Sequence, residues 1–261
     1  MLYDTHIHLD ILLQKLGQDF DEKTATSWFE NHEVALQSTT STDNFLKTKS
    51  QFRNFDKIQF FLGSHPEIVT KDFNLEKYLK SQLETLQTLD LTDFVGFGEI
   101  GLDYFYTQNT ELVAIQKQLF DKQVKLAIAL GKPIMIHCRE AFEDLFAILR
   151  QNPEIHGKFL IHCFTGNTWD LEQILDMDGY VGIGGIVTFA SAKNLQQAVL
   201  ECPLEKMVLE TDLPFLCPKR GEICMPKDIK LVATKIAQIK GLTEEIIWSK
   251  TRTNLTKLFN I

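Results

Sequence analysis

The chain has 261 residues, and its 35 acidic and 27 basic side chains leave a formal net charge of −8. Hydrophobic residues make up 44% of it and charged residues 24%, a balance typical of globular proteins that excludes a disordered chain or a disulfide scaffold. No apolar run reaches the length of a membrane span and no signal peptide is visible, so we expect a cytoplasmic protein without a membrane partner. The acidic balance argues against attachment to nucleic acid through a general basic surface.

Eight short apolar runs rich in β-branched residues predict eight strands, and each run ends in a polar or Gly-rich cluster. Their almost continuous hydrophobicity is typical of parallel strands that are buried on both faces. The predicted strands are Leu2–Thr5, Val34–Gln37, Ile58–Gly63, Phe94–Gly98, Pro133–Ile136, Lys158–Ile161, Tyr180–Ile183 and Met207–Leu209.

Several segments between these runs have the 3.6-residue period of helices. The clearest is Thr110–Leu130, which is followed by the helix-stopping residues Gly131 and Pro133. Thr243 is a plausible N-cap for the last helix, which has acidic residues in its first turn. The other predicted helices are Ala141–Arg150, Leu195–Leu200, Ile229–Ile239 and Glu244–Phe259.

The polar clusters recur about every 29 residues, which is the repeat of a (β/α)₈ barrel. We therefore predict an α/β fold, a (β/α)₈ TIM-type barrel in which residues 1–261 form a single domain. An open doubly wound sheet is the structural alternative. The barrel is favoured because it brings all the polar clusters to one mouth, at the carboxyl ends of the strands.

Five of the seven histidines lie at the ends of predicted strands. His6 and His8 are two residues apart, so in an extended strand they point to the same side and can bind one metal ion together. His32 and His156 fall elsewhere, and we expect both on the solvated surface. The remaining strand-end histidines are His65, His137 and His162.

Carboxylates accompany these histidines. Glu99 is expected at the terminus of the fourth strand and Asp212 follows the eighth. Imidazole and carboxylate groups are costly to bury unpaired, and divalent ions remove that cost. A carboxylate that bridges two ions, with histidines on each, is the arrangement of two-metal hydrolysis, and Glu99 is the expected bridge. Asp212 is expected to bind a metal and to accept the proton of the attacking water.

Several motifs occur in an order and spacing that cover essentially the whole chain. They resemble those of the TatD-type metal-dependent deoxyribonucleases of the amidohydrolase superfamily. The resemblance implies a TIM-type barrel and a divalent-metal phosphodiesterase acting on DNA. The matching segments are DTHIHLD, GSHPE, GEIGLDY, PIMIHCREA, IHCFTG, GYVGIGG, LETDLPFLCP and the closing TxxNLxxLF pattern that begins at Thr251.

The resemblance also implies roles for individual residues. One divalent ion would be held by His6 and His8, and a second by His137 and His162. Glu99 would bridge the two ions, and Asp212 would join the first site and serve as the base. The sequence leaves open whether the ions are Mg²⁺, Mn²⁺ or Zn²⁺.

Substrate contacts are implied in the same way. His65 would contact the scissile phosphate or help the leaving group, and Arg139 would bind a phosphate. Arg220 is a further expected substrate contact, in the loop that follows the last acidic motif. Asp4 and Asp10 would orient the metal ligands, although solvated turn carboxylates explain them nearly as well.

The loop after Asp212 departs from the family pattern. Arg220, Gly221 and Pro226 match it, but Cys224 and Met225 replace the expected Asn-Glu pair. Since this loop should lie near the substrate, the preference among DNA ends or other esters is open. The five cysteines form no CxxC pair and predict reduced thiols.

The leading hypothesis is a two-metal deoxyribonuclease that trims DNA from an end, with single-stranded ends as the substrate. The alternative enzyme hydrolyses a small ester, amide or phosphoester at the same centre, although Glu99 stands where an amidohydrolase would carry a carbamylated lysine. If the chain were a non-catalytic binding protein, some of the expected metal ligands at the barrel mouth would be replaced in the sequence. We find no such replacement. Two ions would bring roughly four positive charges to the mouth, so the acidic balance excludes a DNA-coating protein rather than a DNA-cutting one.

Overall fold

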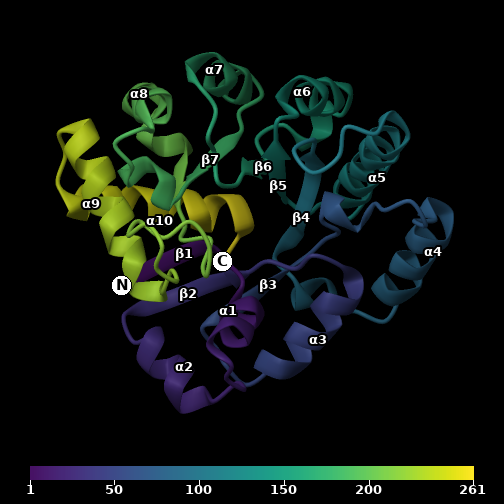
Figure 1. Cartoon of the computed structure of the whole chain (residues 1–261), viewed down its shortest axis with the longest axis horizontal. Coiled ribbons are helices and arrows are strands. Elements are labelled where there is room, and N and C mark those ends of the chain that lie inside the picture. The colour runs from purple at the N-terminus through teal and green to yellow at the C-terminus, as the bar shows by residue number, and fades with distance from the viewer.

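A computed structural model describes residues 1–261, and its centre is an eight-stranded parallel sheet with the order β1 to β8 (Figure 1). The (β/α)₈ barrel predicted from the sequence is confirmed. The strands are β1 (Leu2–Ile7), β2 (His32–Gln37), β3 (Ile58–Leu62), β4 (Gly96–Asp103), β5 (Ile134–Arg139), β6 (Phe159–Ile161), β7 (Tyr180–Ile183) and β8 (Met207–Leu209).

The first and last strands meet at their carboxyl ends. Ile7 forms a parallel bridge with Leu213, just beyond the end of β8. The Asp212 amide donates to the His6 carbonyl at 3.0 Å, and the His8 amide donates to the Leu213 carbonyl at 2.8 Å. This nearly closes the barrel, and it places residues from the two ends of the sequence side by side at its mouth.

The helices surround the strands (Figure 1). Those predicted from the sequence are present, with bounds shifted by up to about two residues. Five helices were not predicted, namely Leu9–Leu16, Glu22–Trp28, Thr42–Phe52, Leu75–Leu86 and Thr168–Asp176. The helices are α1 (Leu9–Leu16), α2 (Glu22–Trp28), α3 (Thr42–Phe52), α4 (Leu75–Leu86), α5 (Thr110–Ala129), α6 (Phe142–Gln151), α7 (Thr168–Asp176), α8 (Lys193–Glu201), α9 (Ile229–Lys240) and α10 (Glu244–Phe259).

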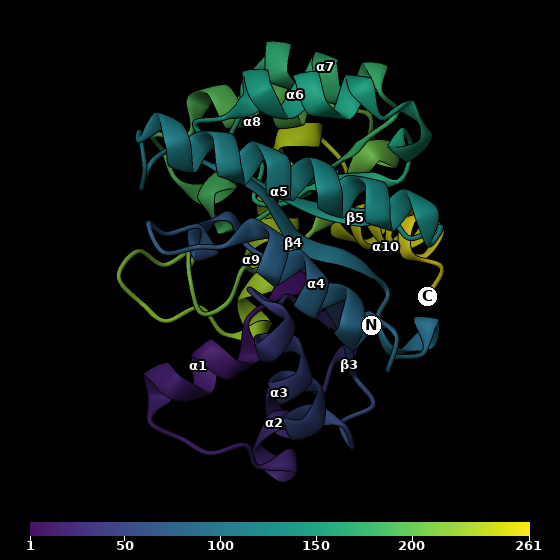
Figure 2. The same ribbon diagram turned by 90° about the vertical axis from the view of Figure 1, so that its right-hand side faces the viewer.

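The interior of the barrel is filled by a compact cluster of apolar side chains. Tyr3, Met135 and Val208 belong to it, and so do Leu255, Leu258 and Phe259 of α10. The Phe259 ring meets the Phe61 ring edge-on at 5.0 Å. Figure 2 shows both termini and α10 at one end of the barrel and the long β8–α9 loop at the other. The amino end is therefore plugged by α10, and the carboxyl end is left for polar groups.

Two sequence predictions are wrong in this part of the fold. Glu99 does not end its strand, because β4 continues to Asp103 through a shift of register opposite β5. His32 is not on the solvated surface: it is the first residue of β2, only 2% exposed, and its ring packs edge-on to Phe29 at 5.2 Å. None of the helices combines the length and apolar character required to cross a membrane.

Candidate metal centre

A cavity of about 500 Å³ opens at the carboxyl ends of the strands. Its walls carry histidines and carboxylates from strands that are distant in sequence. Residues of the β4–α5 and β8–α9 loops form its rim. The lining includes His8, His65, Glu67, Glu99, Asp103, Tyr106, His137, Arg139, His162, Cys163, Asp212, Phe215 and Leu216.

One group of four donor atoms converges beside β1 and β8. The Nε2 atoms of His6 and His8 are 3.0 Å apart. Each lies 3.4–3.6 Å from Glu99 Oε2 and 3.5–3.6 Å from Asp212 Oδ1. Ligands that share one divalent ion at about 2.0–2.2 Å have this kind of spacing. The four side chains are therefore arranged to hold a single ion.

A second group of donors lies on the other side of Glu99. Its Oε1 atom is 2.8 Å from His137 Nδ1 and 2.7 Å from His162 Nε2. These two histidine nitrogens are 3.4 Å apart. The two oxygens of Glu99 thus face two separate groups of histidines, as a bridging carboxylate would.

Burial and the surrounding histidines set the charge of Glu99, which is 3% exposed. Burial alone would raise the pKa of its carboxyl, but the positive charge of His162, whose own pKa is raised, and the hydrogen bond from His137 outweigh burial and hold the pKa of Glu99 well below its usual range. Conversely, burial lowers the pKa of His6 and His8, which favours the neutral imidazoles that metal ions bind.

Asp212 has a different environment. Its backbone adopts a left-handed conformation, with φ 58°, directly after β8. Burial raises the pKa of its carboxyl to about 8, and the negative charges of Glu99 and Glu210 act in the same direction against the pull of His162. This environment therefore favours the protonated form of the Asp212 carboxyl unless a cation lies beside it.

The donor set fits divalent cations, because it concentrates buried carboxylates whose only basic neighbours are histidines. No Lys or Arg lies within salt-bridge distance of Glu99, Asp103, Glu210 or Asp212, whose charged neighbours are histidines. The Glu210 Oε2 atom is buried without a hydrogen-bond partner. Such an excess of buried negative charge is costly unless cations offset it.

Two carboxylates that the sequence analysis assigned no role lie behind the histidines. Asp103 Oδ2 is 2.9 Å from His137 Nε2, which directs the Nδ1 lone pair of His137 toward the centre. Glu210 Oε1 lies 3.7 Å from His162 Nδ1. A Cβ atom at Gly182 would lie 2.3 Å from the Glu210 carboxylate, so any larger residue there would displace that carboxylate. Asp103 lies in the GLDY part of one motif and Glu210 in the LETD part of another. Their place in these motifs was the signal from which a role could have been predicted.

The two acidic residues expected to orient the ligands contact other groups instead. Asp4 is fully buried and accepts hydrogen bonds from the amides of His6 and Thr211 and from the Thr211 hydroxyl. Asp10 accepts from the side-chain amides of Gln37 and Asn44. Neither carboxylate forms a hydrogen bond with a histidine ring. They fix the start of the β1–α1 turn and its junction with β8.

His65 and Arg139 both lie at the cavity. His65 Nδ1 accepts the Glu67 amide at 3.3 Å, which leaves Nε2 to carry the proton, 3.5 Å from Glu99 Oε1. Burial lowers the pKa of His65 to about 3, so its ring is neutral. The Arg139 guanidinium stacks over the Phe105 ring at 3.6 Å and has no salt bridge with a carboxylate.

The structure does not bring Arg220 into the cavity. Its guanidinium donates to the Ser191 hydroxyl at 3.0 Å and lies over the Phe189 ring at 4.4 Å. The β8–α9 loop therefore directs this side chain outward against the segment before α8. The predicted substrate contact of Arg220 is not supported by this placement.

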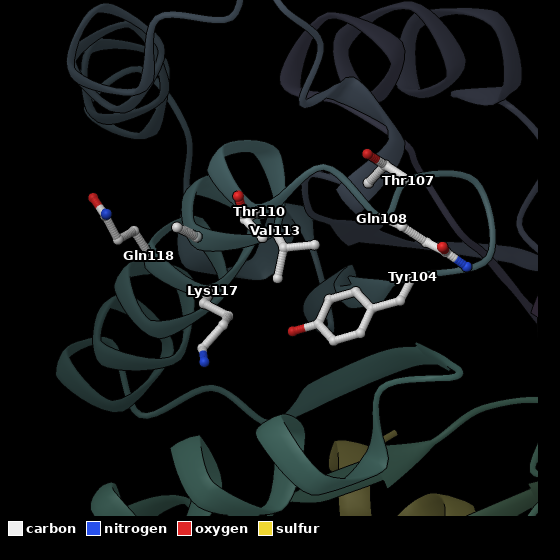
Figure 3. Close-up of a pocket in the computed structure, with 8 residues that line it drawn as sticks. Tyr104, Thr107, Gln108, Thr110, Val113, Lys117 and Gln118 are labelled. Atoms are coloured by element: carbon white, nitrogen blue, oxygen red, sulfur yellow. The ribbon is translucent and has the colours of Figure 1, made fainter.

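Exposed aromatic residues lie at the rim beside Arg139. Phe105 is 50% exposed and Tyr106 is 65% exposed, and they were not singled out in the sequence. From this loop a groove of about 690 Å³ continues along the start of α5. Figure 3 shows its side chains, with the Tyr104 hydroxyl and the Lys117 amine facing the same space. The groove contains none of the clustered histidines and is an extension of the rim.

A family model described as TatD related DNase matches residues 3–260. The chain belongs to the TatD family. YabD of Bacillus subtilis, an uncharacterized metal-dependent hydrolase, is 32% identical to this chain over 267 residues. The match covers 100% of this chain and 100% of YabD. This TatD-family chain is accordingly an enzyme, a metal-dependent hydrolase.

Two further TatD-related proteins extend the comparison. The human 3'-5' RNA nuclease TATDN2 is 30% identical over 279 residues, which are 99% of this chain and 35% of the human protein. The crystal structure of YjjV, a TatD homolog from Escherichia coli, superposes with a TM-score of 0.87 at 23% identity and covers 100% of this chain and 98% of YjjV. The structural similarity to YjjV supports the barrel fold.

Proposed function

We propose that this chain is a nuclease that hydrolyses phosphodiester bonds of DNA from a single-stranded end, using two divalent ions. The observation that carries the proposal is the position of Glu99, whose two carboxylate oxygens face two separate groups of histidines. A pair of sites that share a carboxylate suits in-line displacement at phosphorus, where attacking and leaving oxygens both develop charge. The match to a family model named for deoxyribonucleases supports the same substrate class.

The residues that would bind metal form two groups joined by Glu99. His6, His8 and Asp212 would hold one ion, His137 and His162 would hold the other, and Glu99 would contact both. When bound, such ions acidify water and neutralise charge on a phosphate group. Asp212 would accept the proton of the attacking water, since its Oδ1 atom lies 3.5–3.6 Å from the Nε2 atoms of His6 and His8 and so beside a water on the first ion.

His65 and Arg139 would position the substrate. The proton on His65 Nε2 is available to a phosphate oxygen, because Nδ1 is occupied by the Glu67 amide. Arg139 offers an unpaired guanidinium at the rim. Its planar donors suit a phosphate oxygen pair. Both groups act as hydrogen-bond donors to a negatively charged substrate.

The rim favours an unpaired strand over a duplex. The exposed rings of Phe105 and Tyr106 offer faces on which bases can stack, and every base can use such a face whatever the sequence. Paired bases inside a duplex do not present those faces. A cavity of about 500 Å³ also accommodates a strand terminus rather than a continuous double helix.

RNA is the second candidate substrate, because the human relative TATDN2 is named as a 3'-5' RNA nuclease. The test is digestion of end-labelled single- and double-stranded DNA and RNA oligonucleotides, together with small phosphodiesters, across Mg²⁺, Mn²⁺ and Zn²⁺. We expect stepwise shortening of single-stranded DNA that a chelator abolishes. Hydrolysis of small esters without digestion of any oligonucleotide would contradict the nuclease assignment and support the small-ester alternative.

A further inference from the structure

A second group of metal-binding side chains lies outside the catalytic cavity, in the segment between β8 and α9. Cys217, Cys224 and Asp228 each place one donor atom within 4.8 Å of the other two. Their exposed fractions are 4%, 0% and 4%, so the group is buried. It shares no residue with the groups around Glu99.

The spacing within this group suits one tetrahedral ion. Cys217 Sγ lies 3.9 Å from Asp228 Oδ2. Zinc binds thiolate sulfur at about 2.3 Å and carboxylate oxygen at about 2.0–2.2 Å, which places two such ligands roughly 3.5 Å apart. Cys224 Sγ lies 3.9 Å from the Thr211 carbonyl oxygen, on the side of β8.

The carboxylate is already oriented by neighbouring donors. Asp228 Oδ2 accepts the Met225 amide at 2.9 Å, and Oδ1 accepts the Lys219 amine at 3.2 Å. Hydrogen-bonded ligands of this kind are common around bound metals, because the bonds fix the ligand's direction. The two thiols contact each other, and their other contacts are the two long ones of 3.9 Å.

A metal ion that cross-links these residues would stabilise the conformation of the chain around them. No helix or strand interrupts Leu213–Met225, and connections of about this length without secondary structure are uncommon in compact domains. Phe215 and Leu216 from this segment line the catalytic cavity.

We propose that Cys217, Cys224 and Asp228 form a zinc site, separate from the catalytic centre, that fixes the β8–α9 loop beside the mouth of the barrel. Each thiol releases its proton to solvent as its sulfur binds the ion, and Asp228 binds as a carboxylate. Three negative ligands on Zn²⁺ leave one negative charge, which the Lys219 ammonium balances. Thiolate ligands favour zinc over Mg²⁺ or Mn²⁺.

Cobalt(II) is the probe that separates this site from the catalytic centre, because thiolate ligands on cobalt give a strong near-ultraviolet charge-transfer band and imidazole or carboxylate ligands do not. Reduced, chelator-stripped full-length protein would be titrated with Co²⁺ and then with Zn²⁺. We expect the band in the wild type and in Glu99→Gln, and its loss when Zn²⁺ is added. Cys217→Ser and Cys224→Ser should lack the band and retain about one zinc fewer per chain after dialysis.

Matched thiol controls decide which sulfur is bound. Cys202→Ser removes a buried thiol away from this group, and Cys163→Ser removes one of the two thiols that line the catalytic cavity; both variants should keep the band. Loss of the band in Cys163→Ser, with retention in Cys224→Ser, would overturn the proposal. A wild-type protein that is folded by circular dichroism but shows no band would also overturn it, and that result needs no variant to fold.

Discussion

Asp103→Asn tests whether the carboxylate behind His137 positions that histidine for metal binding. Asp103 is 1% exposed, and its two oxygens have separate partners. Oδ2 is 2.9 Å from His137 Nε2, and Oδ1 accepts the Phe105 amide at 2.9 Å. Burial raises the pKa of Asp103, but the hydrogen bond from His137 outweighs burial, so the pKa is lowered and the group is ionised.

Asparagine keeps the shape of the side chain but not its chemistry. It has one oxygen for two donors, so either His137 or the Phe105 amide must face the new NH₂ group. Loss of such a partner behind a metal-binding histidine typically costs 10- to 100-fold in metal affinity or activity. That range corresponds to about 1.4–2.7 kcal/mol, at 1.36 kcal/mol for each factor of ten.

The assay measures phosphodiesterase activity against metal concentration in chelator-stripped protein. For Asp103→Asn we expect the half-saturating metal concentration to rise by about 10- to 100-fold. Asp144→Asn is the matched control, because its carboxylate contacts Lys117 and Tyr104 and no histidine. An unchanged half-saturating concentration in a folded Asp103→Asn variant would refute the reasoning.

Three further predictions concern stability and substrate binding. Burial lowers the pKa of His32 to about 4, below its unfolded value of about 6.5, so the unfolded chain binds the proton more readily and stability falls as pH drops through this window. In urea unfolding, this group should lower the free energy of unfolding at pH 5 by about 2 kcal/mol relative to pH 7. The His32→Phe variant should lack that part of the pH dependence. Tyr106→Ala should weaken single-stranded oligonucleotide binding by about 1–3 kcal/mol in fluorescence titrations, with hydrolysis of a small phosphodiester unchanged; equal losses for both would contradict a stacking role. Phe259→Ala should lower the free energy of unfolding by about 3–5 kcal/mol, because its ring packs on Phe61 inside the barrel, while bound metal per folded chain stays the same; metal loss in the folded variant would show that the two ends are coupled.

Much of this fold could be predicted because barrel strands repeat at a constant interval and their ends share one mouth. His6, His137 and Asp212 are far apart in sequence. Their common position at the barrel mouth nevertheless follows from the rule that the carboxyl ends of parallel strands converge. The helices near the N-terminus were harder to predict. Asp21 and Ser41 do cap α2 and α3, but those helices are short and their apolar residues are sparsely spaced.

Side-chain direction was the part that the sequence did not determine. Arg220 matches the family pattern, yet it contacts Ser191 outside the cavity, because loop conformation rather than position decides where a long side chain points. His32 was expected in solvent, since the predicted second strand began two residues later. The partnership of Asp103 with His137 needs the pairing of β4 with β5, where Gly101 lies opposite His137, and no spacing along one segment shows that pairing.

The central claim is that Glu99 joins two metal sites in a phosphodiesterase centre, and Glu99→Gln tests it most directly. The measurement is the release of nucleotides from end-labelled single-stranded DNA at saturating metal, with Glu67→Gln as control because that carboxylate lines the same cavity without forming a salt bridge to a histidine. Glutamine cannot offer an anionic oxygen to both histidine groups, so kcat/KM should fall at least 100-fold, or about 2.7 kcal/mol, while Glu67→Gln stays within a few-fold of the wild type. A folded Glu99→Gln protein with wild-type activity would contradict the account.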